Sequence, residues 1–508
     1  MEARIQNALI SVFDKSGLEP IIHQLSSLGI KMYSTGGTAD FITGLGVEVF
    51  QVEDLTGYPS ILDGRVKTLH PKVFGGILAR REEGHLAQLS EFDIPAIDLV
   101  IVDLYPFEKT VASTSDESTI IEKIDIGGIS LIRAAAKNYK DVVIVPSQAQ
   151  YQSLLHLLTT QGGITQLEQR RSLAAAAFEV SSHYDSAIYQ YFAQLTDHSP
   201  AIKLSVSPGQ PLRYGENPHQ KATFYGNLEE IFGFLGGKEL SYNNLVDVDA
   251  AMALMSEFQG AKPTFAIIKH TNACGVASRN TVLDAWNAAL AADPVSAFGG
   301  IFITNTEVDE ATAKEVDKLF YEILIAPSYS PAALEVLLEK KKRIILQLKA
   351  YPKVHHSVKS LLNGVIQQDH DLHRHDAGAW KVVTKIAPTE DQMLDLYFAN
   401  QCVKHLKSNT IVLVKDGQLI GMGCGQTSRV DACHHAIDKA RKFGFDVSGS
   451  VMASDAFFPF PDCVAIAHEA GIHAVVQPGG SIKDQLSIDY CDEHQMAMVV
   501  TGIRHFRH

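Results

Sequence analysis

Short apolar runs alternate with amphipathic stretches through the first part of the chain. The runs Ala8–Val12, Leu99–Val102 and Val142–Val145 predict buried strands, and Ile30–Tyr33 predicts another. Amphipathic segments separate these runs, and an Ala-rich region from Gln166 to Leu195 predicts a long helix. Strands that alternate with helices are typical of a parallel, doubly wound sheet. The first part of the chain is therefore predicted to be an α/β domain of that kind.

Two similar passages in the second part of the chain suggest an internal duplication. We expect a strand, a glycine turn, a helix and a Ser-x-(x)-Phe segment in the same order in both. These are Phe265–Ile268, Lys269–Gly275, Val282–Leu290 and Ser296–Gly299 in the first passage, and Thr410–Val414, Gly423–Arg429, Ala432–Lys442 and Ser454–Phe457 in the second. Between the two parts, the polar segment Thr196–Pro200 is typical of a linker. It predicts one domain at residues 1–198 and another at 199–508.

Bulk properties narrow the class of protein. A chain of 508 residues is too long for a single core, and 46% hydrophobic with 20% charged residues is ordinary for a globular protein. No apolar stretch has the length of a membrane span and the start is not a signal peptide, so we expect a cytoplasmic protein without membrane contact. The net charge of −14 argues against nucleic acid as a partner. Six scattered cysteines without a CxxC pair suggest neither disulfides nor a structural metal.

A strand end in the second part carries candidate acid–base chemistry. The apolar run Phe265–Ile268 ends at Lys269 and His270. Ligands of α/β folds bind at strand ends, and an adjacent Lys and His can donate and accept a proton. A surface turn with a solvated lysine and a capping histidine is the alternative for an isolated pair.

Two segments of the first part are candidate anion sites. Ser34-Thr35-Gly36-Gly37-Thr38 lies between a predicted strand and a predicted helix, where glycines and helix amides can hold a phosphate. The segment Asp63–Lys72 places Arg65, Lys67 and Lys72 close together in an acidic chain. An ordinary turn and a solvated basic loop are the respective alternatives.

Several longer motifs resemble one enzyme family. They are Leu212–Gln220, Leu240–Leu245, Lys269-His270, Ser454–Asp462 and Arg504–His508, in that order along the chain. They resemble the transformylase part of the bifunctional purine-biosynthesis family, in which AICAR (5-aminoimidazole-4-carboxamide ribonucleotide) formyltransferase is joined to IMP cyclohydrolase. The first part of the chain resembles the cyclohydrolase. The resemblance implies a methylglyoxal-synthase-like first domain and two cytidine-deaminase-like subdomains after it. The deaminase zinc motif itself is missing from the sequence, so no metal is expected.

The resemblance also implies two sets of site residues. In the cyclohydrolase, the catalytic residues would be Lys67, Tyr105, Asp125 and Lys137, and the nucleotide would contact Ser11, Ser34, Thr35, Gly36, Gly37, Thr38, Arg65, Lys67 and Thr68. In the formyltransferase, Lys269, His270 and Asn409 would be catalytic, and the nucleotide and folate would contact Arg213, Tyr214, Asn244, Gly299, Glu322, Arg429, Phe457, Asp462 and Arg504. Phe13 and Glu322 depart from the family pattern, in which a small hydroxylic residue and, in some members, Asp occupy those positions.

The implied activity is the final pair of steps to IMP. A formyl group would pass from 10-formyltetrahydrofolate, a co-substrate, to AICAR, and formyl-AICAR would then cyclise with loss of water. No permanently bound cofactor would be needed, because lysines, a tyrosine and carboxylates can supply the proton transfers. The family also implies a homodimer. The alternative interpretation is a formyltransferase whose first domain is a nucleotide-sensing module without catalysis.

Overall fold

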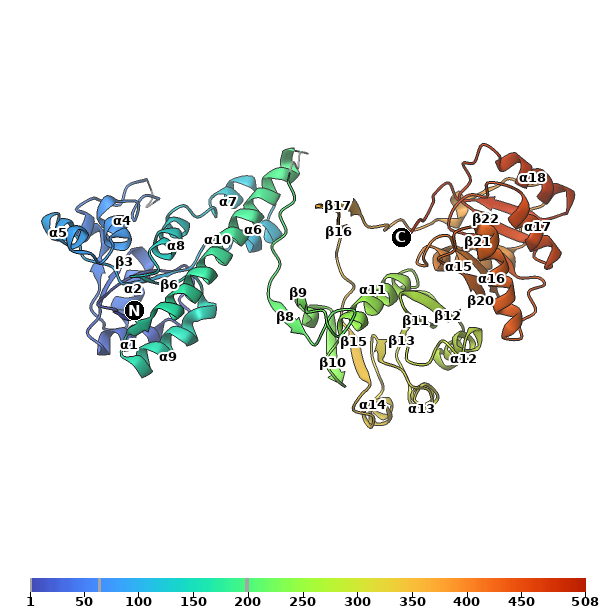
Figure 1. Ribbon diagram of the computed structural model, residues 1–508, viewed down its shortest axis with the longest axis horizontal. Helices are drawn as coiled ribbons and strands as arrows, with labels where there is room; N and C mark the ends of the chain where they lie inside the picture. Colours follow the sequence, from blue (N-terminus) through green and yellow to red (C-terminus); the bar gives the residue numbers. More distant parts are fainter. Residues whose placement is uncertain (1, 63–64, 197–200) are drawn as a thin grey trace. The chain divides into compact units, whose positions relative to one another are not determined.

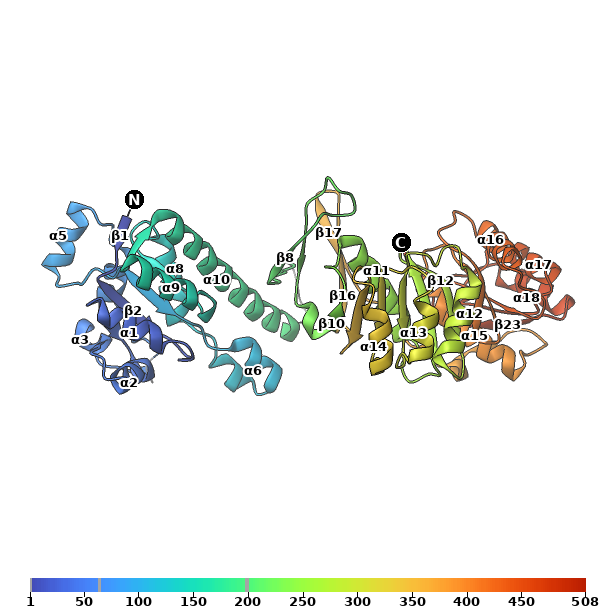
Figure 2. The ribbon, with the colours of Figure 1, turned by 90° about the horizontal axis from the view of Figure 1, so that it is seen from below.

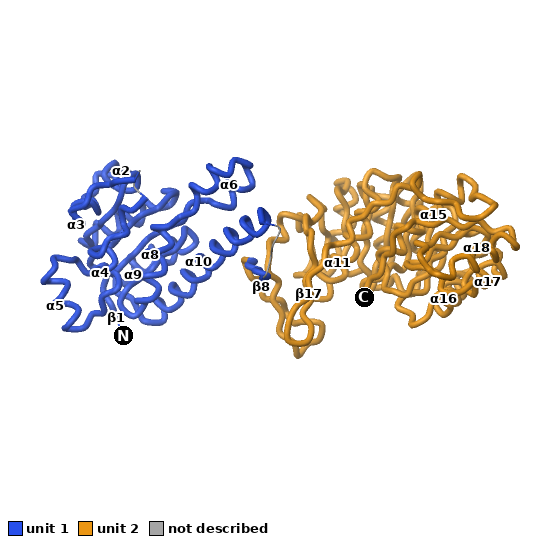
Figure 3. The backbone as a smooth tube through the Cα atoms, turned by 90° about the horizontal axis from the view of Figure 1, so that it is seen from above, with its two compact units in different colours: residues 1–206 blue, residues 207–508 orange. Residues whose placement is uncertain are grey.

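The computed structural model describes residues 2–62, 65–196 and 201–508 (Figure 1). The chain divides into two compact units, residues 1–206 and 207–508 (Figure 3). Most of the predicted linker, residues 197–200, lies outside the described residues, and so do Asp63 and Gly64 of the basic segment. The domain boundary at residues 198 and 199 remains a prediction.

Unit 1 is built on a five-stranded parallel sheet of order β4-β3-β2-β5-β6. Its strands are β1 (Glu2–Arg4), β2 (Asn7–Ser11), β3 (Lys31–Ser34), β4 (Phe50–Gln51), β5 (Leu99–Val102), β6 (Val143–Val145) and β7 (Ile164–Gln166), of which β1 and β7 pair separately. Its helices are α1 (Glu19–Ser27), α2 (Gly36–Gly44), α3 (Val52–Thr56), α4 (Pro71–Leu78), α5 (Glu83–Glu91), α6 (Phe107–Ser113), α7 (Glu117–Ile121), α8 (Gly127–Lys137), α9 (Tyr151–Gln161) and α10 (Leu167–Thr196).

Helices cover both faces of this sheet, which confirms the predicted doubly wound fold. Ala8 and Ile10 of β2 pack with α1, α2 and α9, whereas Leu9 points to the other face and packs with α4, α8 and α10. This alternation follows from the two-residue period of a strand. The predicted long helix is α10, which runs past the edge of the sheet (Figure 2).

Unit 2 contains a mixed sheet of twelve strands, in the order β10-β15-β14-β13-β11-β12-β20-β19-β21-β22-β23-β18. The strands of the unit are β8 (Gly209–Leu212), β9 (Ala222–Tyr225), β10 (Phe232–Gly236), β11 (Thr264–Lys269), β12 (Asn272–Ser278), β13 (Ile301–Thr304), β14 (Ile323–Ala326), β15 (Ile344–Leu348), β16 (His356–Leu361), β17 (Gly364–Asp369), β18 (Lys381–Val382), β19 (Ile411–Lys415), β20 (Gln418–Gly423), β21 (Val451–Ser454), β22 (Ala474–Gln477) and β23 (Ala497–Val500). The helices are α11 (Tyr242–Ser256), α12 (Val282–Ala292), α13 (Glu310–Val316), α14 (Pro331–Leu338), α15 (Glu390–Val403), α16 (Arg429–Lys442), α17 (Asp462–Glu469) and α18 (Asp484–Glu493).

The predicted internal repeat is present in this sheet. In each half a helix, α11 or α15, precedes an antiparallel hairpin, β11–β12 or β19–β20, and three parallel strands follow with helices between them. The halves meet where β12 pairs with β20. Helices α11 and α15 share one core on one face of the sheet, while α12–α14 and α16–α18 each form a separate core. The deaminase-like relationship of the halves remains a prediction.

Two details of the predicted repeat are wrong. The segment Asn272–Gly275 belongs to strand β12, because the turn after Lys269 contains only His270 and Thr271. The Ser-x-(x)-Phe segments are also not equivalent, since Ser296 lies before β13 whereas Ser454 is the last residue of β21. Among the described residues, no helix is long and apolar enough to cross a membrane.

Candidate functional sites

The candidate site of unit 1 lies at the carboxyl edge of its parallel sheet. Strand β3 ends at Ser34, and Thr35 leads directly into α2 through Gly36. Gly36 has a φ of 46°, a left-handed conformation that glycine adopts without steric cost. The first N–H groups of a helix have no partner inside the helix and favour anions. The start of α2 therefore offers donors to a phosphate.

Two ammonium groups approach this helix start. A Cβ atom placed on Gly36 would lie 3.2 Å from Nζ of Lys67, and one on Gly37 would lie 3.9 Å from Nζ of Lys15. On the other side, a Cβ atom on Gly127 would lie 3.1 Å from Oγ1 of Thr68. The structure thus brings together the glycine turn, the basic segment and the start of α8, as the sequence predicts. Lys15 is an addition that the sequence analysis did not include.

The hydroxyl groups of Ser34 and Thr38 form hydrogen bonds within the fold. Ser34 is fully buried and donates to the carbonyl of Ile10 at 2.7 Å, and Thr38 donates to the carbonyl of Val12 at 2.9 Å. Thr38 Oγ1 also accepts from the N–H of Val12. These bonds hold the end of β2 against α2, so in this arrangement neither hydroxyl donates to a ligand. The donors that this place offers to an anion are instead backbone N–H groups and lysines.

Asp125 and Tyr105 lie together beside the start of α8. Asp125 accepts the N–H of Gly128 at 2.6 Å. Burial raises the pKa of Asp125, and bonds from the N–H groups of Gly128 and Tyr105 oppose that rise. Burial, and then the charge of Asp125, raise the pKa of Tyr105. Both groups are thus shifted toward their protonated forms.

Tyr184 of α10 holds the segment that carries Asp125. Its hydroxyl accepts the N–H of Asp125 at 2.9 Å and donates to the carbonyl of Lys123 at 2.5 Å. The ring is 7% exposed and packs against Phe107. The sequence analysis missed this residue, because α10 follows the site by many residues and Tyr184 lies in no motif.

Phe13, the departure from the family pattern, packs against the site by its ring. Its centroid lies 5.5 Å from that of Tyr105 in an edge-on arrangement. The ammonium group of Lys123 lies 5.7 Å from the Phe13 centroid and 5.5 Å from the Tyr105 centroid. The phenylalanine therefore replaces a hydrogen-bonding group with an aromatic and cation–π contact.

Two further predicted cations of unit 1, Arg65 and Lys137, differ in their surroundings. Arg65 forms an ion pair with Glu122, and both side chains are largely exposed. Lys137 is the last residue of α8, and Asp125 precedes the first. An 11-residue helix is about 15 Å long, so Lys137 lies near the residues that lead into β6, at the opposite edge of the sheet. The structure does not bring Lys137 to Asp125.

In unit 2, Lys269 and His270 lie at the hairpin between β11 and β12. Lys269 pairs with Asn272, so the turn consists of His270 (φ 52°) and Thr271 (φ 63°). The carboxylate of Asp247 on α11 accepts both N–H groups of the turn, at 3.3 Å from His270 and 2.7 Å from Thr271. Nζ of Lys269 donates to the carbonyl of Phe298 at 2.7 Å. The backbone of this turn and the ammonium group of Lys269 are therefore held in place.

The hairpin between β19 and β20 repeats these contacts with other residues. Lys415 pairs with Gln418, and the turn is Asp416 (φ 53°) and Gly417 (φ 66°). Asp395 of α15 accepts both N–H groups, at 2.8 and 2.7 Å. Nζ of Lys415 donates to the carbonyl of Ser448 at 2.7 Å. The two turns are structurally equivalent.

The strands β12 and β20 are paired at one end and separated at the other. Ala277 pairs with Gln418, and Ser278 donates its N–H to Gly417 at 2.9 Å, so the end beside the second turn is closed. At the end beside the first turn, a cavity of about 240 Å³ lies between the strands. It is lined by Lys269, His270, Asn272, Ala273, Cys274, Ser296, Met422 and Lys439. The predicted acid–base pair therefore faces the cavity between the two repeats.

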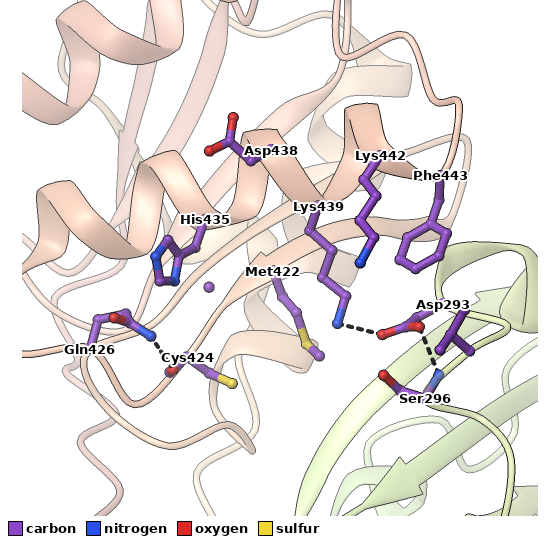
Figure 4. A pocket seen from close by; sticks show the side chains of 12 residues that line it. Asp293, Ser296, Met422, Cys424, Gln426, His435, Asp438, Lys439, Lys442 and Phe443 are labelled. Atoms are coloured by element: carbon purple, nitrogen blue, oxygen red, sulfur yellow. Dashed lines mark hydrogen bonds and ion pairs between the residues drawn. The ribbon is translucent and has the colours of Figure 1, made fainter.

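A second cavity, of about 470 Å³, adjoins the first and shares Ser296, Met422 and Lys439 with it. Figure 4 shows His435, Lys439 and Lys442 of α16 on one side and Asp293 with Ser296 on the other. Nζ of Lys439 lies 2.7 Å from Asp293. Burial opposes ionisation of Asp293, but the bonds from Lys439 and Ser296 prevail and lower its pKa. This ion pair joins the two repeats across the cavity.

Asn409 and Arg429 lie on the β19 side of the cavities. Nδ2 of Asn409 donates to the carbonyls of Gln426 at 3.0 Å and Thr427 at 3.2 Å, so both amide hydrogens are used. Arg429 donates to Ser454 at 3.1 Å and to Asp455 at 3.0 Å. Asp455 is 1% exposed and also accepts the hydroxyl of Ser408. The sequence analysis quoted the motif that contains Asp455 but assigned no role to this carboxylate.

The remaining predicted residues of unit 2 have contacts elsewhere. Arg213 donates to the hydroxyl of its neighbour Tyr214, Asn244 caps α11 in a reciprocal bond with Ser241, and Glu322 pairs with Lys238 at 2.6 Å. Phe457 is half-buried, and Asp462 begins α17. None of these six residues lines either cavity in the part of the chain that the structure describes. Their roles remain predictions.

The fold defines an α/β enzyme with two candidate centres, a helix start that offers donors to an anion and a Lys-His pair at a cavity between two repeats. Two known families match the chain. Residues 17–130 match the family described as an MGS-like domain, which confirms the predicted fold of unit 1. Residues 135–439 match the family described as the AICARFT/IMPCHase bienzyme.

Relatives cover the whole chain. A bifunctional purine biosynthesis protein PurH from Bacteroides thetaiotaomicron is 58% identical over 99% of this chain and 99% of its own. Proteins of the same name from Acetivibrio thermocellus and Chlorobium chlorochromatii are 47% and 45% identical over 99% of this chain, and cover 100% and 99% of their own lengths. The chain belongs to the AICARFT/IMPCHase bienzyme family, which uses 10-formyltetrahydrofolate as co-substrate.

Proposed function

We propose that the chain carries both activities of its family, with formyl transfer in unit 2 and cyclisation in unit 1. Bifunctional relatives that align over the whole length support this assignment. The observation that carries it is the position of Lys269 and His270 at the open end of the β12–β20 pair. The alternative of a sensing first unit without catalysis has less support, because Asp125 and Tyr105 are gathered beside the anion site.

His270 and Lys269 would move the protons of formyl transfer. The amine of AICAR attacks the formyl carbon of 10-formyltetrahydrofolate, and its proton must leave during the attack. A neutral imidazole is a suitable base near pH 7. The tetrahydrofolate nitrogen must gain a proton as it departs, and the ammonium group of Lys269, held by Phe298, can donate one. The cavity keeps the two groups side by side.

Asn409 would orient a substrate through its oxygen. Both hydrogens of its amide already bind carbonyl oxygens, which can only accept, so the assignment of nitrogen and oxygen is unambiguous. The amide therefore has no donor left for an oxyanion. Oδ1 can accept from the amine or the carboxamide of AICAR. Of the two roles open to an amide side chain here, this leaves orientation of a substrate and excludes stabilisation of an oxyanion.

In unit 1 the nucleotide phosphate would bind at the start of α2. The N–H groups of Gly36 and Gly37 and the ammonium groups of Lys67 and Lys15 converge on that place. The formamide would then lie toward Tyr105 and Asp125. Lys67 would stabilise the oxyanion that forms when the carboxamide nitrogen attacks the formyl carbon, and the two acids would move protons. A catalytic role of Lys137 in cyclisation is supported by the family resemblance alone.

The Lys67→Ala variant tests the cyclisation site. We expect cyclisation of added formyl-AICAR to fall by about 10²-fold or more, because the cation lies beside both phosphate and reacting group. Formyl transfer should be unchanged and serves as the internal control. A matched variant is Lys31→Ala, at the exposed start of β3 and away from the carboxyl edge. Near-normal cyclisation in Lys67→Ala would refute the assignment.

We further propose that the units act independently, in a cytoplasmic homodimer. Each unit has its own sheet and cores, and all six cysteines are free, as in a reducing compartment. Residues 1–198 alone should cyclise formyl-AICAR, and a folded but inactive fragment would contradict this boundary.

Light scattering should give a dimer at micromolar concentration. A fully active monomer would contradict the oligomeric state.

A further inference from the structure

The C-terminal segment Arg504–Arg507 runs beside the formyl-transfer site. His505 is 3% exposed and donates its N–H to the carbonyl of Asp455 at 3.0 Å. Arg507 donates its N–H to the hydroxyl of Ser408 at 3.0 Å and accepts the N–H of Ser408 at 2.9 Å. The segment is therefore bonded to Asp455, which supports Arg429, and to Ser408, which precedes Asn409 in the chain.

Phe506 joins the same group through its ring. The guanidinium group of Arg504 lies 4.4 Å from the ring centroid, and that of Arg429 lies 5.8 Å from it. Arg429 and Arg504, both predicted to contact a substrate, thus share one aromatic ring. The C-terminal segment Arg504–Arg507, which we call the tail, supplies that ring. The position of Arg504 depends on how the tail is anchored.

A line of hydrogen bonds anchors the tail through the side chain of His505. Nε1 of Trp380 donates to Nδ1 of His375 at 3.3 Å. Nε2 of His375 lies 2.5 Å from Nε2 of His505, and Nδ1 of His505 lies 2.5 Å from Oδ2 of Asp371. We call these four residues the tail relay.

When both imidazoles are neutral, the hydrogen bonds of the tail relay can be donated in only one direction, from Trp380 toward Asp371. The indole can only donate, so Nδ1 of His375 accepts and its Nε2 carries the hydrogen. Nε2 of His505 then accepts, and its Nδ1–H donates to the carboxylate. Burial lowers the pKa of His375 to about 4. Burial alone would raise the pKa of Asp371, but the contact with His505, the charge of Lys404 and the N–H of His373 together outweigh it and lower that pKa to about 2. Every polar group in the relay is satisfied without a buried imidazolium.

We propose that His505 is a positioning residue for formyl transfer, which holds Arg504 and Phe506 at the site through the tail relay. The inference rests on the role proposed for Arg504. Without the imidazole, Asp371 retains Lys404 at 3.8 Å, but the tail loses its only side-chain bonds at residue 505 among the described residues. The backbone bonds at His505 and Arg507 then remain as a looser attachment.

Three variants of the full-length enzyme test this inference. His505→Leu removes both ring bonds, His505→Asn retains a donor near Asp371, and Trp380→Phe removes only the far end of the relay. We expect His505→Leu to raise the Michaelis constant of one substrate of formyl transfer by roughly 10-fold, with turnover nearly kept. The affected substrate should be the one whose Michaelis constant rises in Arg504→Ala. His505→Asn should recover part of the loss, and Trp380→Phe should show the smallest effect.

A merely structural role would give a different result. Partial unfolding lowers the amount of active enzyme and thus the apparent turnover, and it leaves the Michaelis constants unchanged. Cyclisation of formyl-AICAR, measured on the same samples, reports the enzyme concentration. If Arg504→Ala raises a Michaelis constant and His505→Leu does not, the inference is wrong while the proposed site stands. If Arg504→Ala raises neither, the role of Arg504 is wrong and the inference falls with it.

If His505→Leu does not yield folded protein, Trp380→Phe decides the question. The indole is a peripheral member of the relay and Phe keeps the contact with Tyr397. A rise of about two-fold or more in the same Michaelis constant supports the inference. An unchanged constant overturns it.

Discussion

The turn between β11 and β12 and the turn between β19 and β20 occupy equivalent places in the two repeats of unit 2. In both, an aspartate of the preceding helix accepts the two N–H groups, and a lysine at the strand end donates to a loop carbonyl. The second turn has Asp416 and Gly417, residues that tolerate left-handed backbone well. The first has His270 and Thr271, of which a β-branched threonine is a poor choice at φ 63°.

This difference shows which features of the first turn belong to the fold and which belong to function. The bond from Lys269 to Phe298 is not evidence of catalysis, since Lys415 makes the same bond at a closed strand end. Of the two turns, the first alone has a β-branched residue at positive φ, and a cavity adjoins it. Strained backbone is typical of functional sites, where chemistry outweighs stability. The second repeat thus provides a control inside the same molecule.

The largest expected effect separates the two turns by function. His270→Ala should lower turnover in formyl transfer by about 10²–10⁴-fold, because the general base is lost in the transition state. Asp416→Ala, at the same place in the second turn, should leave turnover nearly unchanged. Steady-state kinetics with both substrates measures this. A raised Michaelis constant with normal turnover in His270→Ala would make His270 a binding residue.

The next variants separate the two roles of a lysine. Lys269→Ala loses one bond of 2.7 Å to a loop carbonyl, and Lys415→Ala loses one of the same length and a second of 3.5 Å. Because the longer bond adds little, the two losses of unfolding free energy should be similar, about 1 kcal/mol. Only Lys269→Ala should also slow formyl transfer, by about 10²-fold. The double variant with His270→Ala should lose much less than the product of the single effects, since both serve one proton-transfer event. Equal activity in both lysine variants would make Lys269 structural.

A smaller effect is expected from the aspartates that hold the turns. Asp247→Asn and Asp395→Asn each weaken two bonds to backbone N–H groups, and each should cost about 1–3 kcal/mol of unfolding free energy in denaturant titrations. Formyl transfer should fall by about 10-fold in Asp247→Asn only, because His270 is displaced. Unchanged turnover in that variant would mean that Asp247 does not position His270.

The smallest effect concerns backbone strain alone. Thr271→Gly should raise the thermal stability of unit 2, by about 1 kcal/mol, because glycine relieves the left-handed conformation. Gly417→Ala should lower it by a similar amount; its Cβ would lie 3.5 Å from the carbonyl of Ser278, so the cost is conformational and not a collision. Calorimetry of both variants tests whether the first turn stores more strain than the second. A destabilised Thr271→Gly variant would remove that idea.

Prediction from sequence succeeded where local order along the chain decides the structure. The runs Ala8–Val12 and Leu99–Val102 became central parallel strands, and motifs that follow strands were gathered at one edge of the sheet. Lys269 and His270 were likewise found at a strand end. Residues that act through distant contacts were missed: Tyr184, Asp247 and Asp455 show their partners only after folding.

Lys137 shows a limit of prediction from family resemblance. Family resemblance assigns it to the cyclisation site, but the helix α8 separates it from Asp125 by its whole length. A match to a family motif identifies a residue, but it does not give the distance between that residue and the reacting groups. The hydroxyl groups of Ser34 and Thr38 illustrate the same point, since both donate to backbone carbonyls within the fold.

The tail described above also sets an order of events during synthesis. Translation proceeds from the N-terminus, and domains generally fold as they emerge. The anion site of unit 1 is complete once the segments up to Tyr184 have left the ribosome. The proposed formyl-transfer site draws on Arg504–Arg507, which are synthesised only after most of unit 2. We therefore expect a growing chain to complete the anion site of unit 1 well before the site in unit 2.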